Sequence, residues 1–329
     1  MKVLLVSGSR ADRGLLHPVY EGLKEKNRAV FIEINRSYYN DTPLGVTEKF
    51  NEAMFNVTSE LTETEYNLVV VLGDRFEILA AVIASTLCRV PIAHISGGDV
   101  TVGSYDNQFR NAITKLSHIH FTAHEQAARN VYSMGETNVY VVGVPGVPEC
   151  RDKEAVVPSG IKKMMVMHYP ATIVEEKEFD EVLAAVDSMK GWVESFILPN
   201  PDVGSGYAGK KLANRARVYT GLPRQEFMNM LFHCDVLVGN SSAGLYEAPN
   251  LRTPTVNVGI RQMGRVSGPS VIHCPAERNA IVAAVEKALQ VKDFTNPYYC
   301  GDATEKIVEA LGMHEEEILS KEILKKGWG

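Results

Sequence analysis

The sequence predicts an α/β protein with two doubly wound domains, and three observations support this prediction. Its 329 residues are about twice the roughly 150 residues typical of one domain. Short β-branched apolar runs alternate with longer amphipathic segments, which is typical of parallel strands connected through helices. The alternation stops near residues 148–160, in a stretch rich in proline, glycine and charge, and then begins again. We therefore expect a linker between two parallel sheets.

The first half contains strand-like and helix-like segments in regular order. The strand-like runs are short and rich in β-branched residues, and most helix-like segments carry apolar residues three or four positions apart. The expected strands are KVLLVSG, AVFIEI, NLVVVLG, VPIAHIS, HIHFTA and VYVVG. The expected helices are LLHPVYEGLKEK, TEKFNEAMFNVTSEL, RFEILAAVIASTLC, NAITKLS and HEQAARNVYSMG.

The second half repeats this alternation. The expected strands are KKMMVMH, ESFILPN, DVLVGN and TPTVNVG. The expected helices are EFDEVLAAVDSMKG, GKKLANRARV, RQEFMNMLFHC, SAGLYEAPNL and NAIVAAVEKALQ. The segment HEEEILSKEILKKG is predicted to form a closing amphipathic helix.

Composition excludes several classes of protein. Apolar residues make up 45% of the chain, and the formal charge is -6 without a run of five like charges, which argues against a nucleic-acid partner. The amino terminus has only four consecutive apolar residues, too few for a signal peptide or a membrane span. The five cysteines form no Cys-x-x-Cys pair, so we expect reduced thiols and a cytoplasmic protein.

Two junctions between a strand and a helix in the first half are unusually polar. In "LLVSGSRADRGLL", Arg10 can bind a phosphate, or it can be solvated beside a tight turn. In "VVVLGDRFEILAA", Asp74 can be a site residue or only the cap of the next helix. Ligands of open parallel sheets bind at the carboxyl ends of strands, so both junctions are candidates for a binding site.

A third polar junction lies in the second half, in "DVLVGNSSAGLYEA". The hydroxyls of Ser241 and Ser242 can cap the following helix or bind an anionic phosphate. Glu247 follows about one helical turn later, where its carboxylate can accept hydrogen bonds from ribose hydroxyls. This junction therefore predicts a nucleotide site, with helix capping as the alternative.

With these junctions in view, the chain resembles the hydrolysing UDP-N-acetylglucosamine 2-epimerases, from the branch that serves the biosynthesis of sialic-acid-type sugars. The resemblance covers nearly the whole chain, and its blocks occur in the order of the family. They are GSRADRGLL, LGDRFEILAA, ISGGDVT with DNQFRNAITKLSH, MHYP, LPNPDVGS, VGNSSAGLYEA and NVGIRQMGRVSG.

The resemblance implies two Rossmann-like domains in a glycosyltransferase-B-like arrangement, with the active site in the cleft between the domains. The expected boundaries are 1–150 for a domain on the sugar side with the catalytic acids, and 151–312 for a UDP-binding domain. A helix at 313–329 is expected to cross back to the first domain. The resemblance also implies a homodimer or higher homo-oligomer.

The implied reaction eliminates UDP across C1 and C2 to give a glycal, and water then adds with the opposite configuration at C2. It needs no metal or redox cofactor, and its product is an N-acetylmannosamine-type sugar. The implied catalytic residues are Asp74, Asp106 and His168. The implied UDP-sugar contacts are Arg10, Ala11, Arg75, Asn200, Leu222 through its backbone, Ser241, Ser242, Glu247 and Arg261.

The chain departs from the family pattern in the segment His94–Arg110, which is expected to line the sugar. The family places a catalytic glutamate where this chain has Ser96, and Asp99 matches a separate family acid. The first domain is also shorter than is usual for the family. A second hypothesis is therefore a UDP-sugar-binding homologue with lost or altered epimerase activity. Glycosyl transfer is a third, because folds of this kind host several chemistries.

Three nearby histidines raise the question of a metal site. His118, His120 and His124 lie in "SHIHFTAH", but the alternation of "HIHF" fits a strand, and no carboxylate has the spacing of a ligand. We therefore expect no metal.

Overall fold

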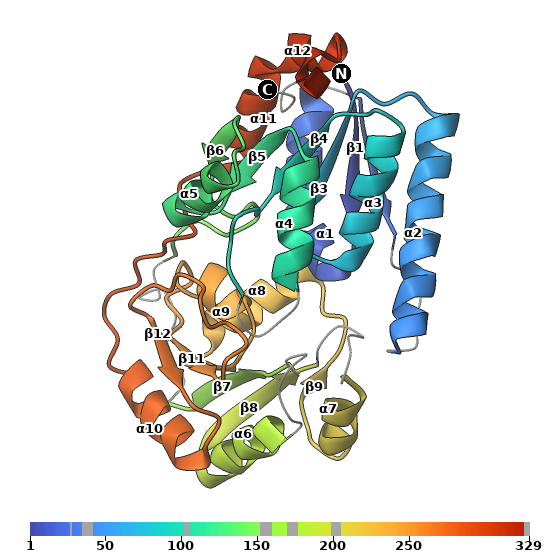
Figure 1. Cartoon of the computed structure of the whole chain (residues 1–329). Coiled ribbons are helices and arrows are strands. Elements are labelled where there is room, and N and C mark those ends of the chain that lie inside the picture. Colours follow the sequence, from blue (N-terminus) through green and yellow to red (C-terminus); the bar gives the residue numbers. More distant parts are fainter. Residues whose placement is uncertain are drawn as a thin grey trace. The chain divides into compact units, whose positions relative to one another are not determined.

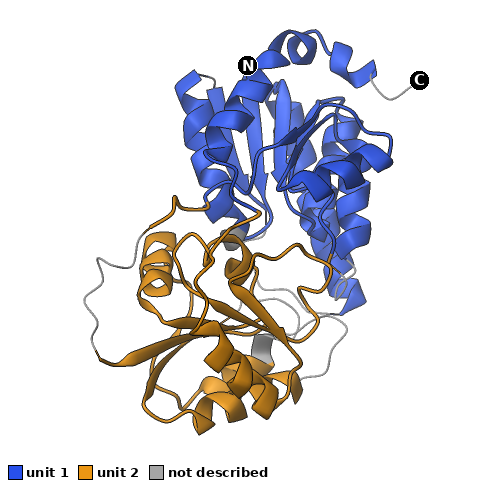
Figure 2. Ribbon diagram, turned by 90° about the vertical axis from the view of Figure 1, so that its left-hand side faces the viewer, with its two compact units in different colours: residues 1–100, 105–146, 298–329 blue, residues 101–104, 147–297 orange. Residues whose placement is uncertain are grey.

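The structure is a computed structural model, and it describes residues 1–26, 28–34, 42–101, 106–151, 160–169, 177–198 and 205–325. The chain forms two compact units, which Figure 2 shows in different colours. Unit 1 comprises residues 1–100, 105–146 and 298–329, and unit 2 comprises 101–104 and 147–297. Each unit contains one six-stranded sheet, so the prediction of two doubly wound α/β domains is confirmed.

The sheet of unit 1 is parallel, with the strand order β2-β1-β3-β4-β5-β6. The chain passes from β1 outward to β2 and then returns to the other side of β1 with β3. The order therefore reverses beside β1 and β3, which is where open α/β sheets bind ligands. The strands are β1 (Lys2–Ser7), β2 (Arg28–Glu33), β3 (Leu68–Leu72), β4 (Ile92–Ile95), β5 (Ile119–Thr122) and β6 (Val139–Val141).

Helices cover both faces of this sheet (Figure 1). Val3 and Leu5 of β1 belong to a core with α1 and α11, whereas Leu4 and Val6 belong to the opposite core with α2, α3 and α4. Alternate side chains of one strand are thus buried on both faces, which explains its continuous apolar run. The helices are α1 (Arg10–Lys26), α2 (Pro43–Glu63), α3 (Phe76–Leu87), α4 (Asp106–Leu116), α5 (Glu125–Ser133), α11 (Ala303–Met313), α12 (Glu315–Leu319) and the 3-10 helix η2 (Glu322–Lys325).

The chain returns to unit 1 at Tyr298, and not at residue 313 as expected from the sequence. The returning part therefore includes α11, whose buried face packs on α1. The expected closing helix is divided into α12 and η2, and Lys321 between them has a φ of 58°. His314 attaches this end to the sheet, because its Nε2 lies 2.7 Å from the hydroxyl of Tyr140 on β6.

The sheet of unit 2 is also parallel, with the order β12-β11-β10-β7-β8-β9. The edge strands β9 and β12 were not predicted from the sequence. The strands are β7 (Lys162–Met167), β8 (Trp192–Ile197), β9 (Val218–Tyr219), β10 (Val236–Gly239), β11 (Thr255–Val258) and β12 (Val271–Cys274). The helices are α6 (Lys177–Ser188), α7 (Ser205–Leu212), α8 (Arg224–His233), α9 (Ala243–Tyr246) and α10 (Arg278–Ala288).

Apolar side chains fill both faces of the second sheet. Val236 and Val238 of β10 pack with α6 and α10, and Leu237 packs on the other face with α8. None of the helices in the described ranges is long and apolar enough to cross a membrane.

Candidate functional site

A buried arginine binds the carboxylate that follows β3. Arg110, in the second turn of α4, is 1% exposed, and its Nη2 donates to Oδ2 of Asp74. Its Nη1 donates to the carbonyl of Asp99 and to Oδ1 of Asn107, at 2.7 Å each. One guanidinium therefore connects the ends of β3 and β4 to the start of α4. Among the described residues, Asp74 bonds only to this arginine, which leaves its Oδ1 for a ligand.

A second acid lies close to this ion pair along α4. Asp106 is the first residue of the helix, one turn before Arg110, so the two side chains emerge on the same helix face. Asp106 is partly buried. Asp74 and Asp106 are the two acids that the resemblance implies to be catalytic. The structure places both of them at the same group of strand and helix ends.

Ser96 follows β4 in a left-handed backbone conformation, with a φ of 68°. Its N–H donates to the carbonyl of Phe121 on β5 at 2.7 Å, which fixes the backbone at this point. Its hydroxyl makes no hydrogen bond to another described residue, and the side chain is partly exposed. The hydroxyl is therefore available to a ligand, although serine is a poor base without a partner.

The two glycines after Ser96 are explained by packing. A Cβ on Gly97 would lie 3.0 Å from Nδ1 of His94 and from Oγ1 of Thr114. Gly98 has a φ of 75°, and a Cβ there would overlap the carbonyl of Ala127 on α5. These contacts show that both glycines are needed where the loop after β4 packs closely against α4 and α5.

Asp99 is held by the helix that follows β5. Nδ1 of His124 accepts the N–H of Ala127 at 3.1 Å, so the ring proton is on Nε2, which lies 3.4 Å from Oδ1 of Asp99. The carboxylate of Asp99 therefore supports the start of α5. This agrees with the expectation that Asp99 does not replace the missing glutamate.

Arg75 lies beside the loop that follows β1. Its Nε and Nη2 donate to the two carboxylate oxygens of the buried Glu77, at 3.2 and 3.1 Å. The arginine stem packs over Gly8, where a Cβ would lie 3.4 Å from its Cδ. The guanidinium is thus held in a fixed orientation next to the candidate phosphate loop.

The first junction is a capped helix start. Oγ of Ser9 accepts the N–H of Asp12 at 3.2 Å and donates to its carboxylate at 2.7 Å. The backbone of Arg10 and Ala11 belongs to the first turn of α1, but their side chains lie outside the described part of the structure. Their binding role remains a prediction.

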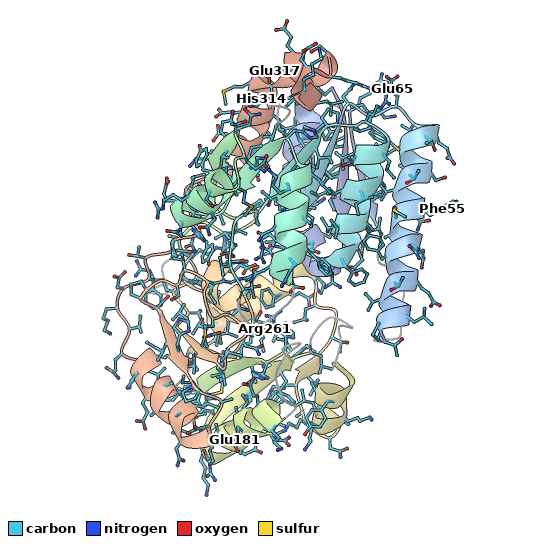
Figure 3. All side chains as sticks on the ribbon, in the orientation of Figure 1. Phe55, Glu65, Glu181, Arg261, His314 and Glu317 are labelled. Atoms are coloured by element: carbon cyan, nitrogen blue, oxygen red, sulfur yellow. The ribbon has the colours of Figure 1, made fainter. Side chains whose placement is uncertain are left out.

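Asn240, after β10, connects three strand ends in unit 2. Its side-chain amide accepts from the N–H of Tyr169 and donates to the carbonyl of Tyr169, both at 2.7 Å. Its own carbonyl accepts from Nη1 of Arg261 at 2.9 Å and from Nε2 of Gln262 at 2.7 Å. Arg261, which Figure 3 labels, also lies over the ring of Tyr169 at 5.4 Å. The ends of β7, β10 and β11 thus form one hydrogen-bonded cluster.

Replacing Asn240 by alanine is expected to lower the free energy of unfolding by about 1–3 kcal/mol, because the backbone groups of Tyr169 lose both partners. The carbonyl of residue 240 stays in place for Arg261, but Tyr169, over whose ring Arg261 lies, loses the two bonds that hold it. Because the resemblance assigns Arg261 to UDP, we expect the variant to bind UDP more weakly as well. Urea unfolding and calorimetry on the variant measure both effects. A variant with unchanged UDP affinity would show that this cluster does not shape the nucleotide site.

His168, after β7, is held as a neutral ring. It is 4% exposed, and burial, with a smaller effect from the charge of Arg261, lowers its pKa to about 3. Its ring stacks on Phe179 at 5.9 Å, and its Nε2 is 3.7 Å from Oε2 of Glu178. Its Nδ1 is buried without a hydrogen-bond partner among the described residues. The positive charge of this site therefore comes from Arg261, and His168 contributes an uncharged donor or acceptor.

The lowered pKa of His168 predicts a pH dependence of stability. Between about pH 6.5 and pH 3, the unfolded chain binds a proton at this residue and the folded chain does not, so stability falls as the pH falls. We expect His168→Gln to reduce the loss of unfolding free energy between pH 7 and pH 5 by about 1–2 kcal/mol. Urea unfolding of both proteins at the two pH values measures the difference, and equal losses would contradict the neutral assignment.

The serine junction in unit 2 shows one of the two roles that the sequence allowed, and the binding of a phosphate stays a prediction. Oγ of Ser241 accepts the N–H of Ala243 at 3.3 Å and so caps the short helix α9. Ser242 makes no cap, and its hydroxyl has no hydrogen bond to a described residue. Its partly exposed hydroxyl is therefore available to a ligand.

Glu247 is bound by Arg224, a residue that was not predicted from the sequence. Arg224 follows Leu222 by two positions, and both of its terminal nitrogens lie 3.3 Å from Oε1 of Glu247. Asn200 lies outside the described residues, so its binding role stays a prediction. No pattern in the sequence indicated the pair of Arg224 and Glu247, because the two residues are far apart along the chain.

The three clustered histidines have separate roles. Nδ1 of His118 accepts the N–H of Ile92 at 3.2 Å, and His124 caps α5. His120 is buried, and burial lowers its pKa to about 3. Within the described ranges, no group of three histidine, cysteine or acidic side chains is arranged to hold a metal ion.

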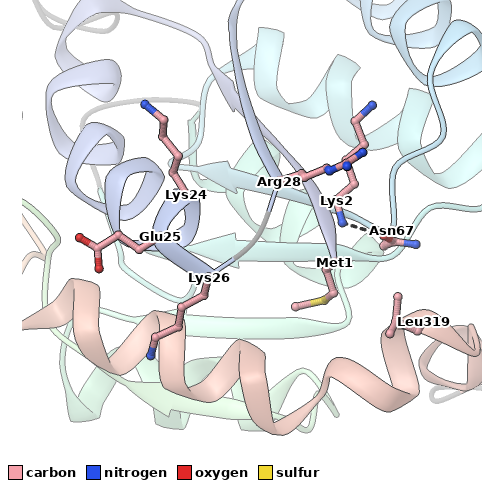
Figure 4. A pocket seen from close by; sticks show the side chains of 8 residues that line it. All are labelled: Met1, Lys2, Lys24, Glu25, Lys26, Arg28, Asn67 and Leu319. Atoms are coloured by element: carbon pink, nitrogen blue, oxygen red, sulfur yellow. Dashed lines mark hydrogen bonds between the residues drawn. The ribbon is translucent and has the colours of Figure 1, made fainter.

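A pocket of unit 1 lies away from these strand ends. It has a volume of about 540 Å³ and lies near the amino-terminal ends of β1 and β2 (Figure 4). In the figure, the ammonium groups of Lys24 and Lys26 point in different directions, so these two side chains do not converge on one ligand. The lining residues are Met1, Lys2, Lys24, Glu25, Lys26, Arg28, Asn67 and Leu319.

Comparison with known proteins assigns the family. The family model described as UDP-N-acetylglucosamine 2-epimerase matches residues 2–312, which is most of the chain. The chain belongs to the UDP-N-acetylglucosamine 2-epimerase family. The resemblance found in the sequence is therefore confirmed, and membership of this family supports 2-epimerase activity on a UDP sugar.

Relatives within the epimerase family cover almost the full chain. Polysialic acid biosynthesis protein P7 of Escherichia coli is 29% identical over 97% of this chain and 95% of its own length. The hydrolysing UDP-N,N'-diacetylbacillosamine 2-epimerase of Legionella pneumophila is 28% identical over 97% of this chain and 98% of its own length. The crystal structure of UDP-GlcNAc 2-epimerase from Neisseria meningitidis bound to UDP-GlcNAc has a TM-score of 0.76 at 19% identity, covering 95% of this chain and 100% of that one. These similarities confirm the glycosyltransferase-B-like fold.

Proposed function

We propose that this protein is a hydrolysing 2-epimerase that converts UDP-N-acetylglucosamine, or a close UDP-2-acetamido sugar, to UDP and an N-acetylmannosamine-type sugar. The observation that carries the proposal is the group formed by Asp74, Arg110 and Asp106, in a chain of this epimerase family. Two carboxylates beside a buried arginine supply a base and an acid without a metal. The proposal names the hydrolysing reaction, which two of the curated relatives carry in their names.

In the first step, a carboxylate removes the hydrogen from C2 while the bond from C1 to the diphosphate oxygen breaks. The products of this step are UDP and a glycal with a double bond between C1 and C2. The accessible Oδ1 of Asp74 and the carboxylate of Asp106 are the candidate bases. In the second step, water adds a hydroxyl to C1 and a proton to the opposite face of C2. The two steps balance without an oxidant or reductant.

The departing diphosphate needs positive charge and hydrogen-bond donors. We assign these to Arg10, Arg75 and Arg261, with the hydroxyl of Ser242 as a further donor. His168 is neutral, so in this proposal it donates one hydrogen bond and adds no charge. Glu247 accepts hydrogen bonds from the ribose. Ala11 and Leu222 are assigned backbone contacts with UDP, and Ser241 and Asn200 are assigned polar contacts with it.

One observation favours a second candidate function. Ser96 replaces the glutamate of the family pattern, and its hydroxyl has no described partner that makes it a base. A protein that binds UDP sugars but has lost or altered the epimerase step would show the same nucleotide site. The difference between the two functions lies in turnover alone.

Calorimetry and a product assay on the same protein separate the two functions. We expect UDP to bind and UDP-N-acetylglucosamine to be consumed, with UDP and a free 2-acetamido sugar appearing in equal amounts. Binding of UDP with no consumption of the sugar nucleotide would favour the binding homologue. UDP-N,N'-diacetylbacillosamine tests a close substrate in the same assay. Absence of UDP binding would contradict both functions.

A further inference from the structure

Arg224 is placed where a helix disfavours a positive charge. It is the first residue of α8, and the amino-terminal end of a helix carries a partial positive charge. Its side chain is 30% exposed, yet it does not extend into solvent. It turns instead toward Glu247, which lies directly after α9, so a specific contact compensates for the unfavourable position.

The contact between Arg224 and Glu247 uses only one of the two carboxylate oxygens. Nη1 and Nη2 both lie 3.3 Å from Oε1, whereas Oε2 accepts no hydrogen bond from another described residue. The side chain of Glu247 is 7% exposed, so its charge requires a partner inside the protein. The guanidinium therefore balances the charge, fixes the rotation of the carboxylate and leaves Oε2 for a donor from outside the chain.

A ribose offers hydroxyl donors that suit a fixed carboxylate oxygen. Glu247 lies five residues after the partly exposed Ser242, the candidate donor to the diphosphate, and Arg224 lies two residues after Leu222. The diphosphate and the nucleoside are joined in one ligand, so an acceptor this close to Ser242 in the chain is suitably placed for the sugar of the nucleotide.

We propose that Arg224 is a positioning residue that directs Oε2 of Glu247 to the ribose hydroxyls of UDP, and that it thereby sets the preference of the site for a ribonucleotide. The proposal rests on the proposed function, because it assumes that unit 2 binds UDP. Arg224 itself does not touch the nucleotide. A purely structural role, in which the ion pair only joins α8 to α9, would affect all nucleotides equally.

Calorimetric titration with UDP and with 2′,3′-dideoxy-UDP, which lacks both ribose hydroxyls, distinguishes these roles. We expect the unmodified protein to bind UDP at least about tenfold more tightly, since a hydrogen bond to a charged group is worth that factor or more. In Arg224→Ala, the affinity for UDP should fall about tenfold while the affinity for the dideoxy analogue changes less than about twofold. Arg224→Lys should restore part of the preference because it keeps the charge.

Further variants complete the test. Glu247→Gln should lose the preference as Arg224→Ala does, and the double variant should lose no more than either single variant. Arg215→Ala is the matched control: Arg215 forms a 2.6 Å ion pair with Asp187 elsewhere in unit 2, so both affinities should stay unchanged.

Three results would overturn the assignment. An equal loss of affinity for both nucleotides in Arg224→Ala would make the ion pair merely structural. An unmodified protein that binds both equally would show that Glu247 does not contact the ribose, although the proposed function would stand. An unmodified protein that binds neither would refute the proposed function itself, and the positioning role with it.

Discussion

Replacing Arg110 by methionine is expected to lower the free energy of unfolding by about 3–5 kcal/mol and to abolish measurable turnover. The variant leaves the carboxylate of Asp74 without its cation and the carbonyl of Asp99 without its donor, while methionine keeps much of the side-chain volume. Catalysis should fail because Asp74 loses the orientation that the guanidinium gives it. Urea unfolding measures stability, and the release of UDP from the sugar nucleotide measures turnover.

A second variant separates the two effects of this arginine. Asp74→Asn removes the negative charge but keeps an acceptor for Arg110, so we expect a smaller loss of stability and a similar loss of turnover. Affinity for UDP should be unchanged in it, because unit 1 acids are assigned to the sugar. Full turnover by folded Arg110→Met would contradict the assignment of this group to catalysis.

Replacing Ser96 by glutamate is expected to raise turnover by about 10²-fold or more, which is the typical contribution of a positioned acid or base. The backbone can accept the change, because its left-handed conformation is already held by a non-glycine residue and by the hydrogen bond from the N–H of Ser96 to Phe121. Steady-state rates of UDP release from the two proteins measure the effect.

Ser96→Gln is the matched control for this variant, because it has the same size without the carboxylate. We expect it to remain at the rate of the unmodified protein. If Ser96→Glu is no faster than Ser96→Gln, the site has diverged from the family by more than one side chain.

The fold was predictable because its central strands are buried on both faces. Such strands give continuous apolar runs, as in β3 and β10, that stand out from the amphipathic helices between them. The edge strand β9 was missed because it has only two residues, and β12 was missed because only its first residue is buried, so it gives no continuous apolar run. The return of the chain to unit 1 occurs at Tyr298, earlier than predicted. Periodicity shows that one face of α11 is buried, but it does not show which unit this face packs against.

The candidate site was predictable in its positions but not in its contacts. Strand ends with polar residues identify the junctions at Asp74 and Ser241, because parallel sheets bring such ends to one edge. The contacts that shape the site join residues far apart in the chain: 36 positions for Asp74 and Arg110, and 23 for Glu247 and Arg224. The periodicity of helices and strands relates residues that are close in sequence, so it gives no signal for pairs that are this far apart.

Incubation with UDP-N-acetylglucosamine in heavy water tests the central claim most directly, because the proposed reaction breaks the C2–H bond and takes a new hydrogen from solvent. We predict free N-acetylmannosamine that carries deuterium at C2, detected by proton NMR and mass spectrometry, together with an equal amount of UDP. Recovery of intact UDP-N-acetylglucosamine without deuterium at C2, from protein that binds UDP, would contradict the account.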